Sequence, residues 1–466
     1  MVPLAEKFDI VVIGGGPGGY AAALYGASAG LKIAVVEKDK VGGTCLHRGC
    51  IPAKEFLETA TVFRTVKGAA TFGVNASAPD LDFAVSQQRK QHVVDQLWKG
   101  LQGLMKRRKV TVVHGIGVLH GDNTVQVDDG TELTGDAVIL AAGSAPRTLP
   151  GFDVDGTLVM TSDEFLSLSA LPRRVAVVGG GVIGCEFASL LCDLGSDVTV
   201  LEFLPRIMVG VDKDIAAVVH RAFERRGVTI KVGAKVTGHT PGPEGGTTVH
   251  VEGQDDLEVD AVVMSVGRRP CSDGLLAEGA GVEVDEHGFV KVDATMRTSA
   301  QGVYAVGDLV ATPQLAHVGY AEAILAVKDI LGEPAVAVDY DNVPWSIYCH
   351  PEAAYAGLSE EAARAAGYEV VVEKLKMVGN SRAIIVGETD GMVKIVAEKD
   401  PDGKAGRILG VHLVGPWVTE QLGQGYLAVN WEATVDDVAQ LVQPHPSLSE
   451  SFGEAVLALT GRSLNS

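Results

Sequence analysis

Residues 8–37 read FDIVVIGGGPGGYAAALYGASAGLKIAVVE, and the expected fold class follows from them. An apolar run leads into the glycine cluster at 14–19, an alanine-rich segment follows at 20–29, and a second apolar run ends at Glu37. The pattern predicts a strand, a tight turn, a helix and a second strand that ends in an acid. A unit of this kind binds a dinucleotide across its glycine turn.

The glycines of this turn have separate tasks. Gly14 closes the turn, Gly16 lets the backbone approach a pyrophosphate, and Gly19 permits close packing of the helix. Glu37 is placed to accept a hydrogen bond from a ribose hydroxyl. The glycines alone are a weak signal, whereas the complete unit with its acid predicts a dinucleotide site.

The same unit returns later in the chain. Gly179, Gly181 and Gly184 repeat the three glycines, and Glu202 repeats the acid. The displacement is constant, because 179 − 14, 181 − 16, 184 − 19 and 202 − 37 all equal 165. The sequence therefore predicts two dinucleotide sites on one chain, one for a resident cofactor and one for an exchanging cofactor. These residues alone do not say which site is which.

Glu202 predicts the choice of nicotinamide coenzyme. A carboxylate at this position binds a free ribose 2′-hydroxyl and repels a 2′-phosphate, so NAD is favoured over NADP. Arg206 lies four residues further on, where an arginine can read a 2′-phosphate. We expect Arg206 to have a surface role instead.

Residues 42–54, GGTCLHRGCIPAK, place two cysteines five residues apart behind the first glycine turn. On a regular helix, side chains at this spacing point about 140° apart, so a bond between Cys45 and Cys50 needs a distorted turn. Gly49 permits such a turn. Two unpaired thiols at a helix start are the alternative, and the nearby fingerprint with Lys54 favours a redox disulfide.

The run 42–54 resembles the redox-active disulfide motif of the flavoprotein disulfide reductases, most of all the dihydrolipoamide dehydrogenases, and the resemblance extends from about residue 7 to about residue 460. It implies that Cys45 exchanges with substrate thiols, that Cys50 lies against the flavin as a thiolate, and that Lys54 approaches the flavin ring. The chain departs from the family in having His47-Arg48 where Asn-Val is common. We expect these two side chains to be solvated, the alternative being a cation that lowers a thiol pKa.

The resemblance assigns FAD to the first unit and NAD to the second. The FAD contacts it implies are Gly14, Gly16, Gly19, Glu37, Lys54, Gly117, Ser144, Asp308, Gln314, Leu315, Ala316 and His317. The NAD contacts it implies are Gly179, Gly181, Ile183, Gly184, Glu186, Glu202, Val236 and Gly267. The activity it implies is re-oxidation of dihydrolipoyl groups to the lipoyl disulfide, with NAD+ as the final acceptor.

His445 and Glu450 are the candidate base and its orienting acid. Histidine titrates near neutrality, and a nearby carboxylate stabilises its protonated form, which suits the removal of a thiol proton. The same residues also fit a helix start at which Ser447 and Glu450 form a capping box. The resemblance implies that the pair is donated to the active site of the other subunit, and hence that the protein is a homodimer.

These patterns predict an α/β protein with two Rossmann-like dinucleotide-binding domains and a C-terminal α+β interface domain. The predicted limits are 1–147 for the first part of the FAD domain, 148–271 for the NAD domain, 272–342 for the part that completes the FAD domain, and 343–466 for the interface domain. Segments 136–146 and 260–270 share an apolar strand, a glycine turn and a proline. Both are predicted crossings between the nucleotide-binding domains.

Composition narrows the possible partners and the compartment. With 39 basic and 59 acidic residues the net charge is −20, which argues against nucleic acid or an anionic membrane as a partner. Six scattered cysteines fit neither a secreted scaffold nor a metal site. Without a leader pattern or a long apolar run, we expect a cytoplasmic protein, although a matrix protein without its transit peptide has the same features.

The resemblance implies two kinds of partner, lipoyl-bearing proteins and the transacylase core of 2-oxo acid dehydrogenase complexes. A glycine cleavage complex is the second assembly in which such a protein would work. One rival is an NADPH-dependent reductase of a small disulfide, which Glu202 disfavours. A rival of another class is a docking flavoprotein subunit without turnover. The intact cysteines, the base and both fingerprints argue against that rival.

Overall fold

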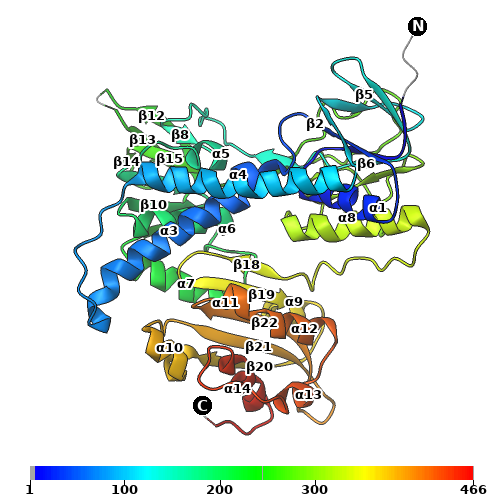
Figure 1. Ribbon diagram of the computed structural model, residues 1–466. Helices are drawn as coiled ribbons and strands as arrows, with labels where there is room; N and C mark the ends of the chain where they lie inside the picture. The colour runs from blue at the N-terminus through cyan, green and yellow to red at the C-terminus, as the bar shows by residue number, and fades with distance from the viewer. Residues whose placement is uncertain (1–5, 244, 465–466) are drawn as a thin grey trace.

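The structure is a computed structural model that describes residues 6–243 and 245–464. Two nucleotide-binding domains lie side by side, with a third domain beneath them in Figure 1. Residues 1–5, on which the expectation about a leader partly depends, lie outside the described residues. Within the described ranges, none of the helices combines the length and apolar character needed to span a bilayer.

The first nucleotide-binding domain is built on a seven-stranded sheet with the order β3-β2-β1-β6-β5-β4, in which β17 also pairs with β6. β17 comes from a distant segment, so two separate pieces of chain form one sheet. Buried aliphatic side chains cover both faces, and α1 packs against α8. The elements are β1 (Glu6–Ile13), α1 (Pro17–Ser28), β2 (Ile33–Glu37), β3 (Thr111–His114), β4 (Gly117–Leu119), β5 (Thr124–Val127), β6 (Glu132–Leu140), β17 (Val303–Ala305), η2 (Gly307–Leu309) and α8 (Ala316–Leu331).

The second nucleotide-binding domain contains a parallel five-stranded sheet with the order β11-β10-β9-β15-β8. A three-stranded antiparallel sheet, β12-β13-β14, packs beside it through a shared apolar core. The elements are β8 (Val159–Met160), α5 (Ser162–Phe165), β9 (Arg174–Val178), α6 (Val182–Asp193), β10 (Asp197–Glu202), α7 (Lys213–Arg225), β11 (Thr229–Val232), β12 (Val236–Pro241), β13 (Thr247–Val251), β14 (Leu257–Val259) and β15 (Ala261–Met264).

The repeat seen in the sequence has the same backbone geometry in both domains. Gly14 and Gly179 have φ angles of 104° and 102°, in the left-handed region that favours glycine. The helix N-caps, Gly16 and Gly181, have φ, ψ of −70°, −172° and −73°, −169°. The first helix begins at Pro17, earlier than the alanine-rich segment suggested, because proline is well suited to the first helical position.

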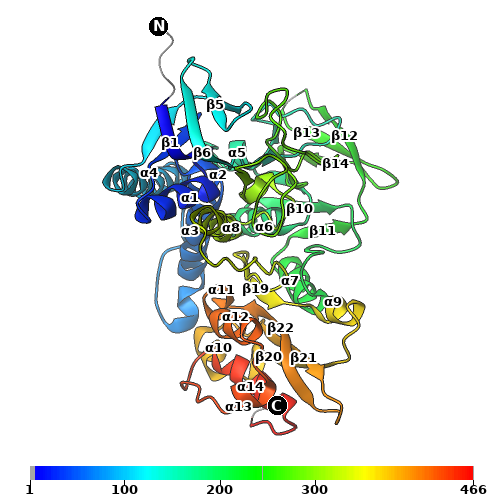
Figure 2. The same ribbon diagram turned by 90° about the vertical axis from the view of Figure 1, so that its right-hand side faces the viewer.

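Two short strands, β7 (Ser144–Pro146) and β16 (Arg268–Pro270), lie at the predicted crossings and pair antiparallel with each other. The two long helices after the cysteine loop lie along one side of both nucleotide-binding domains (Figure 2). The second is capped at its start by Asp82, whose carboxylate accepts from Val85 N–H. This region contains α2 (Gly43–Arg48), α3 (Cys50–Gly68), η1 (Ala69–Phe72) and α4 (Phe83–Arg107).

The third domain is an antiparallel five-stranded sheet with the order β18-β19-β22-β21-β20. C-terminal helices pack against this sheet, and α7 of the second domain also contacts it. Its elements are β18 (Trp345–Ile347), β19 (Glu352–Gly357), α9 (Glu360–Ala365), β20 (Val370–Lys376), η3 (Met377–Gly379), α10 (Ser381–Val386), β21 (Met392–Lys399), β22 (Ala405–Gly415), α11 (Val418–Gln421), α12 (Gly423–Asn430), α13 (Val435–Ala439) and α14 (Glu450–Leu459). The predicted fold class is confirmed.

Candidate active site

The cysteine loop is a break between two helices. α2 ends at Arg48 and α3 begins at Cys50, with Gly49 between them at φ −144° and ψ −109°, outside helical geometry. This break brings the Cα atoms of Cys45 and Cys50 to 4.6 Å, and the two sulfurs form the predicted disulfide. The loop therefore presents an intramolecular disulfide at the start of a long helix.

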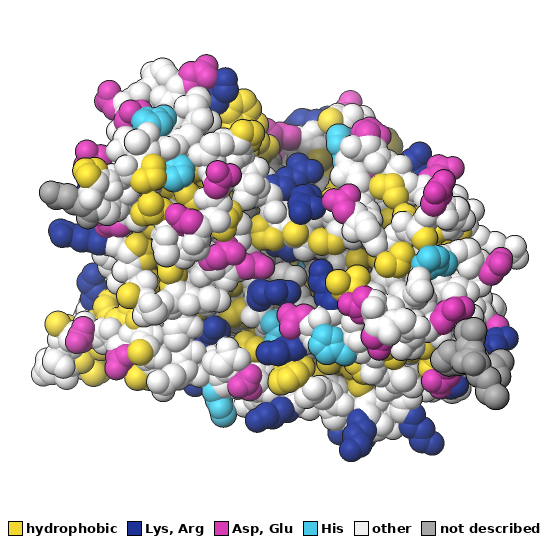
Figure 3. Space-filling view, turned by 90° about the horizontal axis from the view of Figure 1, so that it is seen from above, with side chains coloured by type: hydrophobic (Ala, Val, Ile, Leu, Met, Phe, Trp, Pro, Cys, Tyr) yellow, Lys and Arg dark blue, Asp and Glu magenta, His cyan; other side chains and the backbone are white. Residues whose placement is uncertain are grey.

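The Cys45–Cys50 disulfide lines a cavity of about 1320 Å³, and residues of both glycine turns line the same cavity. Seen from above, two lobes flank a hollow into which Lys and Arg side chains project (Figure 3). Most of the predicted cofactor contacts line this cavity, namely Gly14, Gly16, Glu37, Lys54, Gly117, Ser144, Asp308, Gln314, Leu315, Ala316, Gly179, Gly181, Ile183, Glu186, Glu202, Val236 and Gly267. One connected space thus joins the disulfide to both dinucleotide units.

Three predicted contacts do not line the cavity. A Cβ on Gly19 or Gly184 would collide with the carbonyl oxygen of Gly14 or Gly179, so these two glycines serve helix packing behind each turn. His317 is exposed, and its Nε2 hydrogen bonds with the Pro344 carbonyl oxygen at 2.8 Å.

The two acids hold their glycine turns in the same way. Glu37 accepts hydrogen bonds from Gly15 N–H at 2.6 Å and from Asp39 N–H at 2.8 Å. Glu202 accepts from Gly180 N–H at 2.6 Å and from Leu204 N–H at 2.7 Å. Each carboxylate oxygen keeps a second acceptor position, so both acids remain able to bind ribose hydroxyls.

Arg206 is already committed to its own loop. Its guanidinium donates to the carbonyl oxygens of Met208, Val209 and Val211 at 2.8–2.9 Å. This binding mode leaves the Arg206 guanidinium committed to backbone carbonyl oxygens, while Glu202 lines the cavity. The expected surface role of Arg206 is therefore a local structural role.

A polar cluster lies where the two domains cross. Asp308 accepts from Ser144 Oγ at 2.5 Å, while Arg268 donates to Ser144 Oγ at 2.7 Å and to its carbonyl oxygen at 2.8 Å. Buried Glu322 supports the adjoining turn by accepting from Gly307 N–H at 2.6 Å. Burial raises the pKa of Glu322 even though hydrogen bonds to its carboxyl group oppose this. Arg268 and Glu322 were not predicted, although Arg268 directly follows Gly267.

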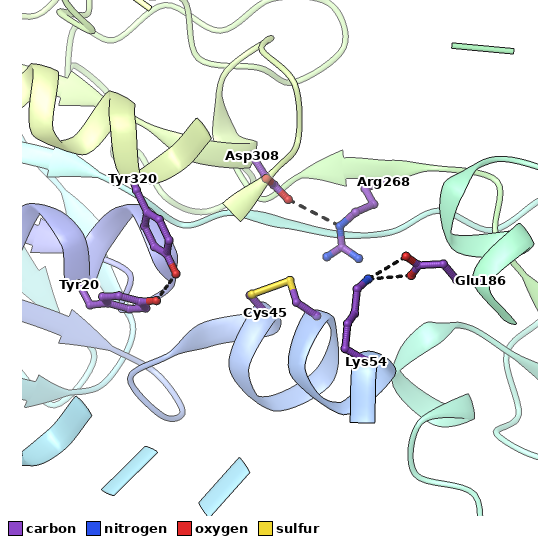
Figure 4. Close-up of a disulfide and its surroundings, with 8 residues drawn as sticks. Tyr20, Cys45, Lys54, Glu186, Arg268, Asp308 and Tyr320 are labelled. Atoms are coloured by element: carbon purple, nitrogen blue, oxygen red, sulfur yellow. Dashed lines mark hydrogen bonds and ion pairs between the residues drawn. A yellow bond between two sulfur atoms is a disulfide. The ribbon is translucent and has the colours of Figure 1, made fainter. Parts of the chain in front are cut away.

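Lys54 and Glu186 meet at the boundary of the two cofactor regions (Figure 4). Lys54 Nζ lies 2.9 and 2.8 Å from the two oxygens of the buried Glu186 carboxylate. Tyr348 N–H also donates to Glu186, at 3.0 Å, and the Tyr348 ring lies under the ammonium group. The pair joins α3, which begins at the disulfide, to α6 of the second domain.

The residues between the cysteines differ from each other in their surroundings. Arg48 is exposed, as expected, with loose ion pairs to Asp39 and Asp163 at 3.7 and 3.9 Å. The expectation that His47 is solvated is wrong. Its Nε2 hydrogen bonds with the Val41 carbonyl oxygen at 3.0 Å, and its ring packs edge-on against Trp98.

The site fits two dinucleotides. Added Cβ atoms at Gly16 and Gly181 would meet open cavity rather than protein, apart from a 3.9 Å approach to Gly43 Cα. Those openings lie at helix N-termini, where backbone N–H groups favour a pyrophosphate. Gln314 Nε2 and Ser265 Oγ are buried at the cavity wall without a partner among the described residues. A bound cofactor would supply the missing hydrogen bonds.

His445 and Glu450 form a pair away from this cavity. His445 Nδ1 lies 2.8 Å from Glu450 Oε1, and Ser447 N–H donates to Oε2 at 2.7 Å. Partial burial works against ionisation, but the hydrogen bonds from Ser447 and His445 lower the pKa of Glu450. The His445 side chain is 70% exposed. Among the described residues, neither His445 nor Glu450 lines the cavity. Ser447 Oγ also accepts from Glu450 N–H, so both reciprocal hydrogen bonds of the predicted capping box are present as well.

Residues 8–323 match the pyridine nucleotide-disulphide oxidoreductase family, and residues 343–456 match the dimerisation domain of the same family. The chain belongs to this family. The resemblance found in the sequence is thereby confirmed. Pyridine nucleotide-disulphide oxidoreductases of this group use FAD and NAD(H).

Similar proteins span the whole chain. The dihydrolipoyl dehydrogenase of Bacillus subtilis is 41% identical over 99% of this chain and 100% of its own length, and that of Thermus scotoductus is 39% identical over 97% and 98%. Among solved structures, LpdA from Mycobacterium tuberculosis has a TM-score of 0.90 at 28% identity, covering 98% of this chain and 100% of that one. The HOCl-induced flavoprotein disulfide reductase RclA from Escherichia coli has a TM-score of 0.86 at 28% identity, covering 96% and 99%.

Proposed function

We propose that this protein oxidises dihydrolipoyl groups to the lipoyl disulfide and passes the electrons through FAD to NAD+. The observation that carries the proposal is a single cavity lined by the Cys45–Cys50 disulfide and by two dinucleotide cradles. The relatives named dihydrolipoyl dehydrogenase support the substrate class. The chemistry that FAD supplies when bound is two-electron transfer between a dithiol and a nicotinamide.

The first exchange takes place at Cys45. A substrate thiol gives its proton to His445 and attacks the Cys45 sulfur, the Cys45–Cys50 bond breaks, and Cys50 leaves as a thiolate. The second substrate thiol loses its proton to solvent and attacks the substrate sulfur bound to Cys45. The lipoyl disulfide forms and Cys45 leaves as a thiolate. The dithiol has then lost two electrons and two protons, and the cysteine pair has gained the electrons.

The cofactor-binding residues divide between the two cradles. FAD would lie along the first glycine turn, with Glu37 at the ribose. The Ser144–Asp308 pair and Gln314 would lie toward the other end of FAD. NAD would lie along the second turn, with Glu202 at its ribose. The ion pair between Lys54 and Glu186 holds a cation at the boundary of the two regions, where the flavin and the nicotinamide would meet.

A homodimer completes the site in this proposal. The His445–Glu450 pair lies outside the cavity of its own chain, is exposed, and belongs to the family dimerisation domain. A second copy that turns its third domain toward the cysteine loop supplies the base. We also propose the domain limits 1–147, 148–271, 272–342 and 343–466, a division that is supported by the separate sheets.

We also propose that the protein assembles with lipoyl-bearing proteins and a transacylase core in the cytoplasm, the setting that the sequence resemblance implies; the relatives named dihydrolipoyl dehydrogenase support the substrate class of such a setting. The net charge of −20 suits a basic docking domain. If docking is electrostatic, its affinity falls as salt rises from about 50 to 500 mM. An affinity that does not change with salt would remove the electrostatic part of this proposal.

An anaerobic titration tests the function. Dihydrolipoamide should reduce the yellow holoenzyme and produce a long-wavelength absorption band from a thiolate beside the flavin. NAD+, but not NADP+, should discharge that band. Reduction by NADPH together with no response to dihydrolipoamide would overturn the proposal in favour of a reductase of a small disulfide. Cys45→Ser should retain FAD and lose turnover with dihydrolipoamide.

A further inference from the structure

Two tyrosines meet beside the redox disulfide. Tyr20 lies at the end of the first turn of α1 and Tyr320 at the start of the second turn of α8, and their hydroxyl groups are hydrogen-bonded to each other. The rings are tilted by 51° with centroids 5.7 Å apart. The two helix starts lie close together, since a Cβ built on Gly319 would be in van der Waals contact with Gly18 N at 3.5 Å. The contact joins segments 300 residues apart.

The pair lies on the other side of the disulfide from the cofactor-side lysine. Figure 4 shows the two phenol groups on one side of the disulfide and the Lys54–Glu186 ion pair on the other. The wall of the cofactor cavity includes Lys54 and Glu186, but neither tyrosine is part of it within the described residues. A dithiol has to reach Cys45 while FAD is resident, so it must approach along a surface that the cofactor does not fill. The tyrosine pair lies on that side.

The pair has one hydrogen-bond donor to spare. Two hydroxyl groups contain two donors, and their mutual hydrogen bond uses one of them. Within the described part of the chain, neither Tyr20 nor Tyr320 has another hydrogen-bond partner. Both side chains are half-buried, so the spare donor can reach water or an incoming anion. The oxidised disulfide is a weak acceptor, whereas a thiolate is a strong one.

We infer that the Tyr20–Tyr320 pair donates a hydrogen bond to the sulfur anion that Cys45 becomes when the lipoyl disulfide is released. This inference rests on the proposed function. In that step the second substrate sulfur bonds to the first, the bond between substrate and Cys45 breaks, and the Cys45 sulfur takes the electron pair. The phenol stabilises the anion without transferring its proton, and protonated His445 from the second copy is the other group that faces it.

Tyr20 remains neutral, and therefore a donor, across the working range of pH. Burial raises the pKa of Tyr20, and the hydrogen bond with Tyr320 raises it further. A neutral phenol keeps its proton beside a thiolate, whose own pKa lies lower. The pair thus stabilises the product of dithiol exchange and has no part in the transfer of electrons to NAD+.

The test uses the FAD-loaded holoenzyme and the variants Tyr20→Phe, Tyr320→Phe and the double variant. We expect reduction by dihydrolipoamide to slow about tenfold in each, the size of one hydrogen bond to an anion, while oxidation of the reduced enzyme by NAD+ stays unchanged. The double variant should lose no more than either single variant, because the two hydroxyls act as one donor. Tyr25→Phe, a phenol elsewhere on α1, is the matched control and should behave as wild type.

A second readout separates this role from mere packing. Alkylation of Cys45 by iodoacetamide in the reduced enzyme should have its pH midpoint about one unit higher in the phenylalanine variants than in wild type. Wild-type rates and midpoints in all variants would overturn the inference and leave the proposed function standing. Equal slowing of both half-reactions, or loss of FAD, would also overturn it by assigning the pair to structure. Failure of wild-type enzyme to react with dihydrolipoamide would overturn the proposed function itself.

Discussion

Lys54 and Glu186 are joined by two hydrogen bonds of 2.9 and 2.8 Å, although 132 residues separate them in the chain. Lys54 lies one turn into the helix that starts at Cys50, and Glu186 lies on the helix that follows the second glycine turn. The resemblance associated the lysine with FAD and the glutamate with NAD. Their contact connects the helix that starts at the disulfide directly to the helix that follows the second glycine turn.

Glu186→Gln should slow the NAD+ half-reaction by tenfold or more and lower thermal stability. The amide still accepts from Tyr348 N–H but leaves the Lys54 ammonium without its counter-charge. Stopped-flow oxidation by NAD+ and thermal unfolding measure the two effects. In Lys54→Met/Glu186→Gln the stability should recover while the rate does not. A single variant with the wild-type rate would contradict a role at the nicotinamide.

Glu202→Ser should reduce kcat/KM for NAD+ by about 10- to 100-fold without creating use of NADP+. The variant loses the acceptor for the ribose hydroxyl and for Gly180 N–H, and the nearby guanidinium of Arg206 stays bound to three carbonyl oxygens. Steady-state kinetics with both coenzymes measure the change. Arg206→Ala is the control, and its ratio of NAD+ to NADP+ activity should equal that of wild type. A marked change in that ratio would show that Arg206 reads the coenzyme.

Hybrid dimers should show where the base acts. Cys45→Ser and His445→Gln enzymes are each expected to be inactive with dihydrolipoamide. If the base comes from the second copy, a random mixture of refolded chains recovers about a quarter of wild-type activity, because half of the dimers are hybrids with one intact site. Activity after mixing measures this, and the ferricyanide reductase activity of each variant controls for folding. No recovery in verified hybrids would place the base in the same chain.

Lys394→Met should destabilise the junction of the second and third domains by about 3–5 kcal/mol. The Lys394 side chain is 0% exposed and contacts Asp212, Asp214 and Glu360 at 2.6–2.9 Å. Its removal leaves the fully buried Asp212 carboxylate without an ion-pair partner, whereas the other two acids keep lysine or arginine partners of their own. Urea unfolding followed by tryptophan fluorescence suits the measurement, because three of the four tryptophans lie beyond residue 343. Lys399→Met is the exposed control, with an effect of about 0–1 kcal/mol. Similar losses in both variants would contradict the argument.

The same junction should weaken in acid. Burial acts to raise the pKa of the Asp212 and Asp214 carboxyl groups. Hydrogen bonds from lysine side chains outweigh burial and lower the pKa of both. A depressed carboxyl pKa stabilises the folded state above the unfolded pKa of about 4, and that stability is lost as pH falls through the folded pKa. Urea midpoints measured between about pH 7 and pH 3 should therefore fall more in wild type than in Lys394→Met. Parallel pH profiles would count against the cluster as the cause.

The sequence alone was sufficient to predict the two glycine turns and the disulfide. The constant displacement of 165 residues predicted two glycine turns, and both have the same left-handed glycine and the same carboxylate clamp. Cys45 and Cys50 were predicted to pair through a turn at Gly49, and they do. These features depend on residues close together in the chain, where backbone geometry and spacing leave few alternatives.

Which distant groups meet depends on the tertiary packing of the domains. Tyr20 with Tyr320, Ser144 with Asp308, and Lys54 with Glu186 are separated by 300, 164 and 132 residues. Their contacts depend on how the sheets order their strands and on how helices of different domains pack, and no short-range pattern encodes either. Neighbouring residues thus determined the cofactor cradles and the disulfide, whereas long-range packing determined how these parts combine into one site.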